Sequence, residues 1–109
     1  MAYIPQKPIQ EHVSQIVTTL LEDDLEHDAR HIVDTVLSIV PDHRIGSATN
    51  RSVAAAAVWC TSRVCSLYRE DSIPSWTQCD IAKASGVCEA TIRNTSRRMQ
   101  GVAADEREL

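Results

Sequence analysis

Guanidinium and amide side chains recur along one stretch near the end of the chain, Thr77–Met99 (TQCDIAKASGVCEATIRNTSRRM). Within it, Arg97 follows Arg93 by four residues and Asn94 by three, so that these side chains share one face if the stretch is helical, and Arg98 follows directly. Arginine and asparagine are the side chains that most often read base edges in the DNA major groove. The pattern therefore points to nucleic-acid contact.

The same stretch carries the signals of two short helices joined by a tight turn. Thr77 is a good N-cap, and Asp80 stands three residues later as a variant of the capping box. Gly86 can adopt the left-handed conformation that ends a helix. Val87 then fills the gap between the helices, and a second helix begins near Cys88. The pattern predicts a helix-turn-helix over residues 77–99, the docking unit of many DNA-binding domains.

Periodicity divides the two helices into an inner and an outer face. The predicted inner face consists of Ile81, Ala82, Ala84, Ile92, Thr95 or Ser96, and Met99. The predicted outer face consists of Glu89, Ala90, Arg93, Asn94 and Arg97. An ordinary helical hairpin with a solvated charged face is the alternative. Small Ala82, the turn residue Gly86 and aliphatic Ile92 stand where a helix-turn-helix needs them, which favours DNA contact.

Three further helices must position this unit. Apolar spacing predicts helices over about 8–22, about 25–40 with caps at Asp23-Asp24, and from Asn50 or Ser52 to about Arg69. The third contains Val53–Trp59 (VAAAAVW), which is apolar most of the way round and is therefore expected at the centre. We expect an all-α, five-helix bundle over residues 8–101 around this alanine-rich helix, with a lead-in at 1–7 and a mobile acidic tail at 102–109.

Charge is distributed unevenly along the 109 residues, whose net charge is −4. Residues 76–100 hold four basic and two acidic side chains, whereas residues 1–46 hold three basic and eight acidic ones. The predicted DNA-facing segment is therefore positive while the whole chain is not. Attraction to phosphates should be modest, and we expect a partner that already sits on the DNA.

Several other classes of site find no support in the sequence. There is no run long and apolar enough for a membrane span, no signal peptide, and no Gly-rich phosphate loop or catalytic arrangement. Cys60, Cys65, Cys79 and Cys88 form no C-x-x-C pair, and no histidine is placed for zinc. We expect no cofactor and a reducing, cytoplasmic setting. A regulatory disulfide between Cys79 and Cys88 stays open.

The alanine run and the stretch at 77–99 together resemble the C-terminal cyclin-like repeat of transcription factor IIB and of its archaeal counterpart, transcription factor B. In that family an Ala-run helix leads, after a short loop, to T-Q-x-x-I-A-x-x-x-G-V-[ST]-E-x-T-I-R, and the archaeal proteins are most similar through GVCEATIRN. The resemblance covers about residues 8–101. It implies a cyclin fold in the archaeal nucleoid, beside TATA-binding protein, with the helix-turn-helix reading the promoter element just upstream of the TATA box.

The resemblance also assigns roles to individual residues. It puts base reading at Ala90 and Arg93, with Arg93 suited to guanine N7 and O6. The positions near these two are Gln78, Glu89, Thr91, Asn94 and Arg97. Of these, Gln78 and Thr91 are better placed for phosphates, and Asn94 suits adenine or a phosphate. Independently of the resemblance, we expect Lys83 and Arg98 to contact DNA of any sequence.

The chain also departs from the family pattern. Cys88 stands where Ser or Thr is usual, which weakens the cap of the last helix by about 1 kcal/mol. Ala90 replaces a larger aliphatic side chain and puts contact with a thymine methyl in doubt. The proline before the central helix is missing. No zinc ribbon or first cyclin repeat is present, so RNA polymerase would be recruited only through regions that this chain lacks.

Four functional hypotheses remain open from the sequence. The chain is either the DNA-binding domain of an initiation factor or a stand-alone regulator that occupies the upstream element without recruiting polymerase; the start at Met1-Ala2 leans towards the latter. A cyclin-fold protein-binding adaptor is a rival of a different class. An unrelated homodimeric repressor with the same motif is the fourth.

Overall fold

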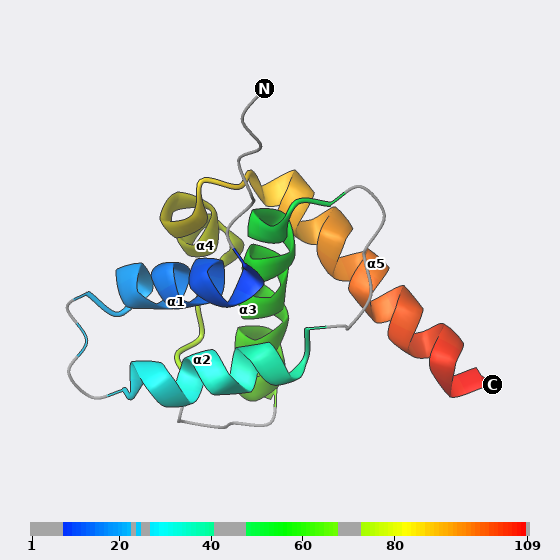
Figure 1. Ribbon diagram of the computed structural model, residues 1–109, viewed down its shortest axis with the longest axis horizontal. Helices are drawn as coiled ribbons and strands as arrows, with labels where there is room; N and C mark the ends of the chain where they lie inside the picture. Colours follow the sequence, from blue (N-terminus) through cyan, green and yellow to red (C-terminus); the bar gives the residue numbers. More distant parts are fainter. Residues whose placement is uncertain (1–7, 23, 25–26, 41–47, 68–72, 109) are drawn as a thin grey trace.

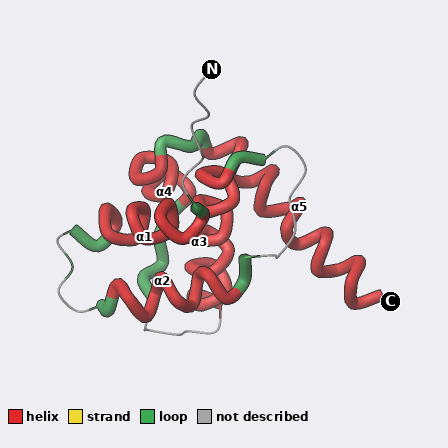
Figure 2. The backbone as a smooth tube through the Cα atoms, viewed as in Figure 1, coloured by secondary structure: helices red, strands yellow, loops and turns green. Residues whose placement is uncertain are grey.

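The chain folds as a bundle of helices. The structure, a computed structural model, describes residues 8–22, 24, 27–40, 48–67 and 73–108. These residues form five helices and contain no strand (Figures 1 and 2). The helices are α1 (Ile9–Leu20), α2 (Ala29–Ser38), α3 (Asn50–Leu67), α4 (Gln78–Ser85) and α5 (Glu89–Glu108). The prediction of an all-helical chain is confirmed within these ranges.

The third helix is the centre of the bundle. It packs against each of the other four helices, with α1 and α2 on one side of it and α5 on the other in Figure 1. Ala54–Ala57 and Val58 are completely buried, as expected for a helix whose apolar residues surround its axis. The predicted position of the alanine-rich helix is therefore confirmed.

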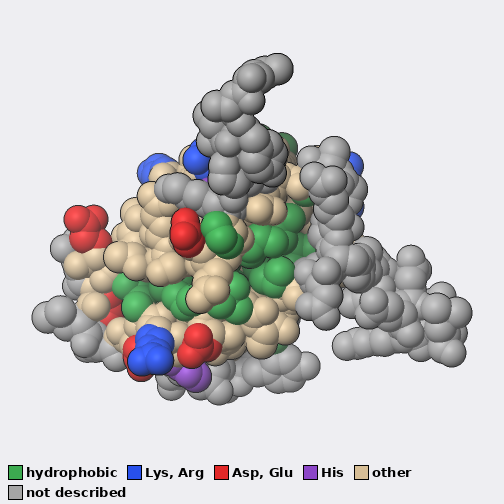
Figure 3. All heavy atoms as spheres, viewed as in Figure 1, with side chains coloured by type: hydrophobic (Ala, Val, Ile, Leu, Met, Phe, Trp, Pro, Cys, Tyr) green, Lys and Arg blue, Asp and Glu red, His purple; other side chains and the backbone are tan. Residues whose placement is uncertain are grey.

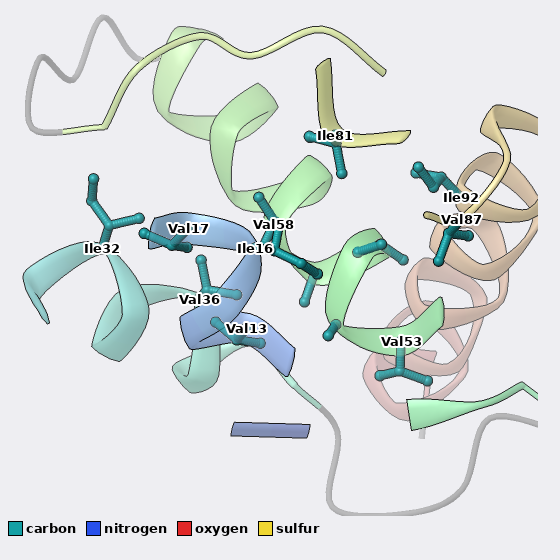
Figure 4. Packing of buried hydrophobic residues seen from close by; sticks show 14 of the residues in the cluster. Val13, Ile16, Val17, Ile32, Val36, Val53, Val58, Ile81, Val87 and Ile92 are labelled. Carbon is teal, nitrogen blue, oxygen red and sulfur yellow. The ribbon is translucent and has the colours of Figure 1, made fainter. Parts of the chain in front are cut away.

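Larger aliphatic side chains from the surrounding helices close the core around these alanines. In Figure 4, Val13, Val17, Ile32 and Val36 form one group between α1 and α2, and Ile81, Val87 and Ile92 form another between α4 and α5. Both groups meet α3, so the first two helices and the last two are held in place through it. On the outside of the molecule, apolar side chains also follow the seam between α1 and α2 (Figure 3).

The start of α2 differs from its prediction. Asp24 does not cap this helix: Asp28 does, with its side chain accepting a hydrogen bond from the N–H of Arg30 at 3.0 Å. Asp23, the other predicted cap, lies outside the described residues. Asp24 instead binds His27, whose N–H and Nδ1 lie 3.2 and 2.8 Å from its carboxylate oxygens. This local turn uses the carboxylate that would otherwise cap the helix, so the helix begins four residues later. Leu25, the predicted first residue of this helix, lies outside the described residues.

The other helix ends lie within a few residues of their predicted places, except the last. α1 ends at Leu20 instead of Glu22, and α3 begins at Asn50 as predicted, with Thr49 Oγ1 accepting from the N–H of Ser52 at 3.1 Å. α5 continues to Glu108, through most of the residues for which we predicted a mobile acidic tail after the bundle. Alanine, glutamate and arginine dominate residues 103–108 and favour helix strongly enough to outweigh the about 1 kcal/mol cost of one interior glycine.

A buried serine joins the central helix to the segment that precedes α4. Ser62 is 1% exposed. Its hydroxyl donates to the carbonyl of Pro74 at 2.8 Å and accepts from the N–H of Trp76 at 2.8 Å. Ile73, at the start of the same segment, is also buried. These contacts determine where the chain enters α4.

Replacing this serine should loosen the α3–α4 connection. We expect Ser62→Ala to lower the free energy of unfolding by about 1–3 kcal/mol, because it leaves a backbone N–H and a carbonyl without their partner. Urea denaturation followed by circular dichroism measures this. Ser38→Ala is the matched control: its hydroxyl donates to Thr35 O on the exposed end of α2, and the change should stay within about 0.5 kcal/mol. Equal effects of the two variants would contradict the role of Ser62.

Candidate nucleic-acid interface

The fourth helix is started by a reciprocal pair of hydrogen bonds. Thr77 Oγ1 accepts from the N–H of Asp80 at 3.1 Å, and Asp80 Oδ2 accepts from the N–H of Thr77 at 3.0 Å. The predicted capping box is therefore confirmed. The backbone N–H of Thr77, followed by its hydroxyl, holds the pKa of Asp80 below its usual value. The carboxylate is thus ionised over the neutral range, where it also favours the helix N-terminus.

The turn after α4 has the predicted left-handed glycine. Gly86 adopts φ 76° and ψ 9°, and its N–H donates to the carbonyl of Ala82 at 2.9 Å. Ser85 Oγ accepts from the N–H of Val87 at 3.1 Å. Val87 is 7% exposed, and so fills the space between α4 and α5 as predicted.

The inner face of α5 is held against α3. Ile92 and Met99 are buried, as predicted from their spacing, and the two alternatives between them, Thr95 and Ser96, are both buried. Ser96 Oγ lies 3.0 Å from the Sγ of Cys60 on α3, within hydrogen-bond distance. These contacts determine the rotation of α5 about its own axis, and therefore which side chains face outward.

The outer face of α5 carries the side chains that were predicted to bind DNA. Arg93, Asn94, Arg97 and Arg98 are exposed. None of these four side chains makes a hydrogen bond or ion pair with another residue of the described part of the chain. Only α3 and α4 among the helices contact α5, so no helix covers this face. Glu89 and Ala90 are exposed and Thr91 is half-buried on the first turn.

The two predicted site residues on α4 are placed differently. Gln78 is half-buried at the start of the helix. Lys83 is exposed and lines an open hollow of about 440 Å³ together with Thr19 and Leu20 from the end of α1. Lys83 therefore lies on the α1 side of its helix. The structure brings the exposed site residues of α5 together on the outer side of that helix. Lys83 is placed elsewhere, beside the end of α1.

An arginine that we did not predict as a site residue lies next to the turn. A Cβ added to Gly86 would be 3.9 Å from Nη1 of Arg51, so the guanidinium at the start of α3 is close to the residues that lead into α5. The sequence gives no signal for this proximity, since the two residues are far apart along the chain.

Cys88 occupies the cap position of α5. Its carbonyl accepts from the N–H of Ile92 at 3.1 Å, and its Sγ lies 3.0 Å from Thr91 Oγ1. Hydrogen bonding from the Thr91 hydroxyl, followed by that from its backbone N–H, lowers the pKa of the thiol. The sulfur thus serves where a Ser or Thr oxygen was expected.

Other kinds of site find no support in the structure. The four cysteines are free thiols, with Cys79 and Cys88 both exposed. Over the described ranges, no group of three or more His, Cys, Asp or Glu side chains is arranged to hold a metal ion. None of the helices, as far as they are described, combines the length and apolarity needed to cross a bilayer.

Comparison with known proteins adds no family assignment. The sequence matches no protein-family model, and no curated protein or solved structure is significantly similar to the chain.

The left-handed turn should be sensitive to a β-carbon because of the backbone alone. We expect Gly86→Ala to destabilise the fold by about 1–2 kcal/mol, the cost of the left-handed conformation for a residue with a Cβ. Steric contact adds little, since the nearest atom would be 3.9 Å away. Gly86→Asn should cost less, because asparagine tolerates this conformation. Thermal unfolding of both variants measures the difference, and an alanine variant as stable as the original protein would contradict it.

The thiol of Cys88 should ionise more readily in the folded chain than in the unfolded one. Because folding depresses its pKa, hydrogen bonds to the thiolate add stability above the unfolded pKa, and this is lost as the pH falls through the folded pKa. Iodoacetamide alkylation of Cys88, followed by peptide mass spectrometry, should therefore reach half its maximal rate at a lower pH in buffer than in urea. Thr91→Val should reduce the difference in pH between the alkylation profiles in buffer and in urea, because it removes the hydroxyl. If this difference is unchanged, the Thr91 hydroxyl is not the cause of the lowered pKa.

Proposed function

We propose that α4, the Gly86 turn and α5 form a helix-turn-helix, and that the protein binds duplex DNA sequence-selectively with α5 in the major groove. The observation that carries this proposal is the outer face of α5, where Arg93, Asn94 and Arg97 are exposed and unpaired within the described residues. Their helix is held by its buried face, so these donors project from a rigid support. A major groove about 12 Å wide admits a helix of this kind.

Each side chain has a role that follows from its chemistry. The planar fork of Arg93 matches the N7 and O6 acceptors of guanine, and this pair is worth about 1–3 kcal/mol of discrimination. Ala90 lies one turn earlier on the same face and allows close approach to a base edge. Asn94 suits adenine or a phosphate. Arg97 and Arg98 suit phosphates, which orient the protein without specifying sequence.

A narrower proposal rests on the resemblance to transcription factor IIB and archaeal transcription factor B. We infer that the chain is a cyclin-like domain which binds a promoter element upstream of the TATA box, beside TATA-binding protein, in transcription initiation or its regulation. The five-helix layout around an alanine-rich helix is compatible with this proposal. The net charge of −4 supports a need for a partner, because such a chain attracts phosphates only weakly.

Base reading and phosphate contact can be separated by two arginine variants. We expect Arg93→Ala to weaken binding to the preferred duplex by about 1–3 kcal/mol and to relax discrimination at one base pair. Arg98→Ala should weaken all duplexes alike. Duplexes selected from a random library by the unaltered protein provide the preferred sequence, and fluorescence anisotropy on that sequence and on a scrambled one measures both effects. If both variants act equally on every duplex, base reading by Arg93 is wrong.

The same assay tests the partner and the rival hypotheses. Adding TATA-binding protein and a TATA-containing promoter duplex should raise the affinity if the narrower proposal holds. Binding should fall steeply with salt, unlike association through an apolar protein interface. A chain that sediments as a dimer and selects palindromes would favour the homodimeric repressor.

A further inference from the structure

The guanidinium of Arg51 lies beside the turn that leads into α5, although Arg51 belongs to the first turn of α3, the central helix. Its Nη1 is 3.9 Å from the position that a Cβ on Gly86 would occupy. Arg51 is exposed, and its side chain forms no hydrogen bond or ion pair with any described residue. A cation without a partner among the described residues therefore lies next to the helix start that the proposed function places at the DNA.

The backbone that carries Arg51 is held firmly. Thr49 caps α3 by accepting from the N–H of Ser52 at 3.1 Å, and its carbonyl accepts from the N–H of Val53 at 3.0 Å. Val53 is buried in the same hydrophobic core as Val87. The first turn of α3 and the turn before α5 are thus anchored in one core, which holds the backbone of Arg51 in place.

The spacing along α5 locates this cation relative to the groove. Arg93 is four residues after the first residue of α5, a distance of about 6 Å along the helix. This is about half the width of the major groove of about 12 Å. If Arg93 lies at the base edges, the turn before α5 lies near the groove rim, where the nearest negative groups are backbone phosphates.

We propose that Arg51 binds a phosphate of the DNA backbone at the rim of the groove that α5 enters. This inference rests on the proposed function and extends the interface from α5 to the first turn of α3. The positive end of the α5 helix dipole attracts the same phosphate.

The experiment uses the full chain and the two duplexes defined above, with a graded series of salt concentrations. Arg51→Gln should reduce affinity about five- to tenfold at 0.1 M salt for both duplexes and lower the salt slope by about one, as expected for one lost phosphate contact. Arg51→Lys should keep most of the slope because it keeps the charge. Arg63→Gln is the matched control, since Arg63 is exposed on the same helix but about 18 Å further along its axis.

The possible results are distinguishable. Binding by the original protein with no effect of Arg51→Gln on affinity or slope would overturn this inference and leave the proposed function intact. A loss confined to the selected duplex would also overturn it, because it would indicate base reading. If the original protein binds neither duplex, both proposals fail. Thermal unfolding of each variant verifies that an altered slope reflects binding and not loss of fold.

Discussion

The close approach of neighbouring helices to α3 is the constraint on which the rest of the arrangement depends. Ala54–Ala57 offer single methyl groups and are completely buried, so that adjacent helices can pack near the short end of the usual separation of about 8–10 Å. α5 contacts α3 more extensively than it contacts α4. The direction of its outer face is therefore determined mainly by the alanine helix, and only secondarily by the turn at Gly86.

Polar contacts make this apolar packing specific. Ser62 binds the segment that enters α4, and Cys60 on the same helix lies within hydrogen-bond distance of Ser96 on α5. Every buried side-chain nitrogen or oxygen in the described residues has a hydrogen-bond partner. Since an unsatisfied buried polar group costs about 1–3 kcal/mol, a shift of α4 or α5 along α3 would break contacts that the aliphatic core alone would tolerate. These hydrogen bonds thus fix the positions of α4 and α5 along α3.

Local signals were sufficient to predict much of the candidate site, because its key features depend on residues close in sequence. The capping box of Thr77 and the left-handed Gly86 each follow from a few neighbouring residues, and so does the buried face through Ile92. The start of α2 could not be predicted in this way, since Asp24 and Asp28 are equally good caps and only the bond to His27 distinguishes them.

Features that depend on tertiary packing were not predictable from the sequence. The position of Lys83 beside the end of α1 depends on how α4 rotates against its neighbours. The proximity of Arg51 to the turn depends on which end of α3 lies there. The helical continuation of α5 to Glu108 was not predicted, although the alanine, glutamate and arginine residues among 103–108 favour helix.

The charged face of α5 contributes little to folding, which is an argument for its having another role. Arg93 and Arg97 are one turn apart on an exposed face, and like charges at this spacing destabilise a helix by a few tenths of a kcal/mol. Glu89 stands one turn before Arg93 in the favourable order, yet the two side chains do not form an ion pair. A chain with eight acidic residues among its first 46 has nevertheless concentrated basic groups here. Folding of the described residues does not require these basic side chains, which is compatible with the proposed contact between this face and the phosphates and bases of DNA.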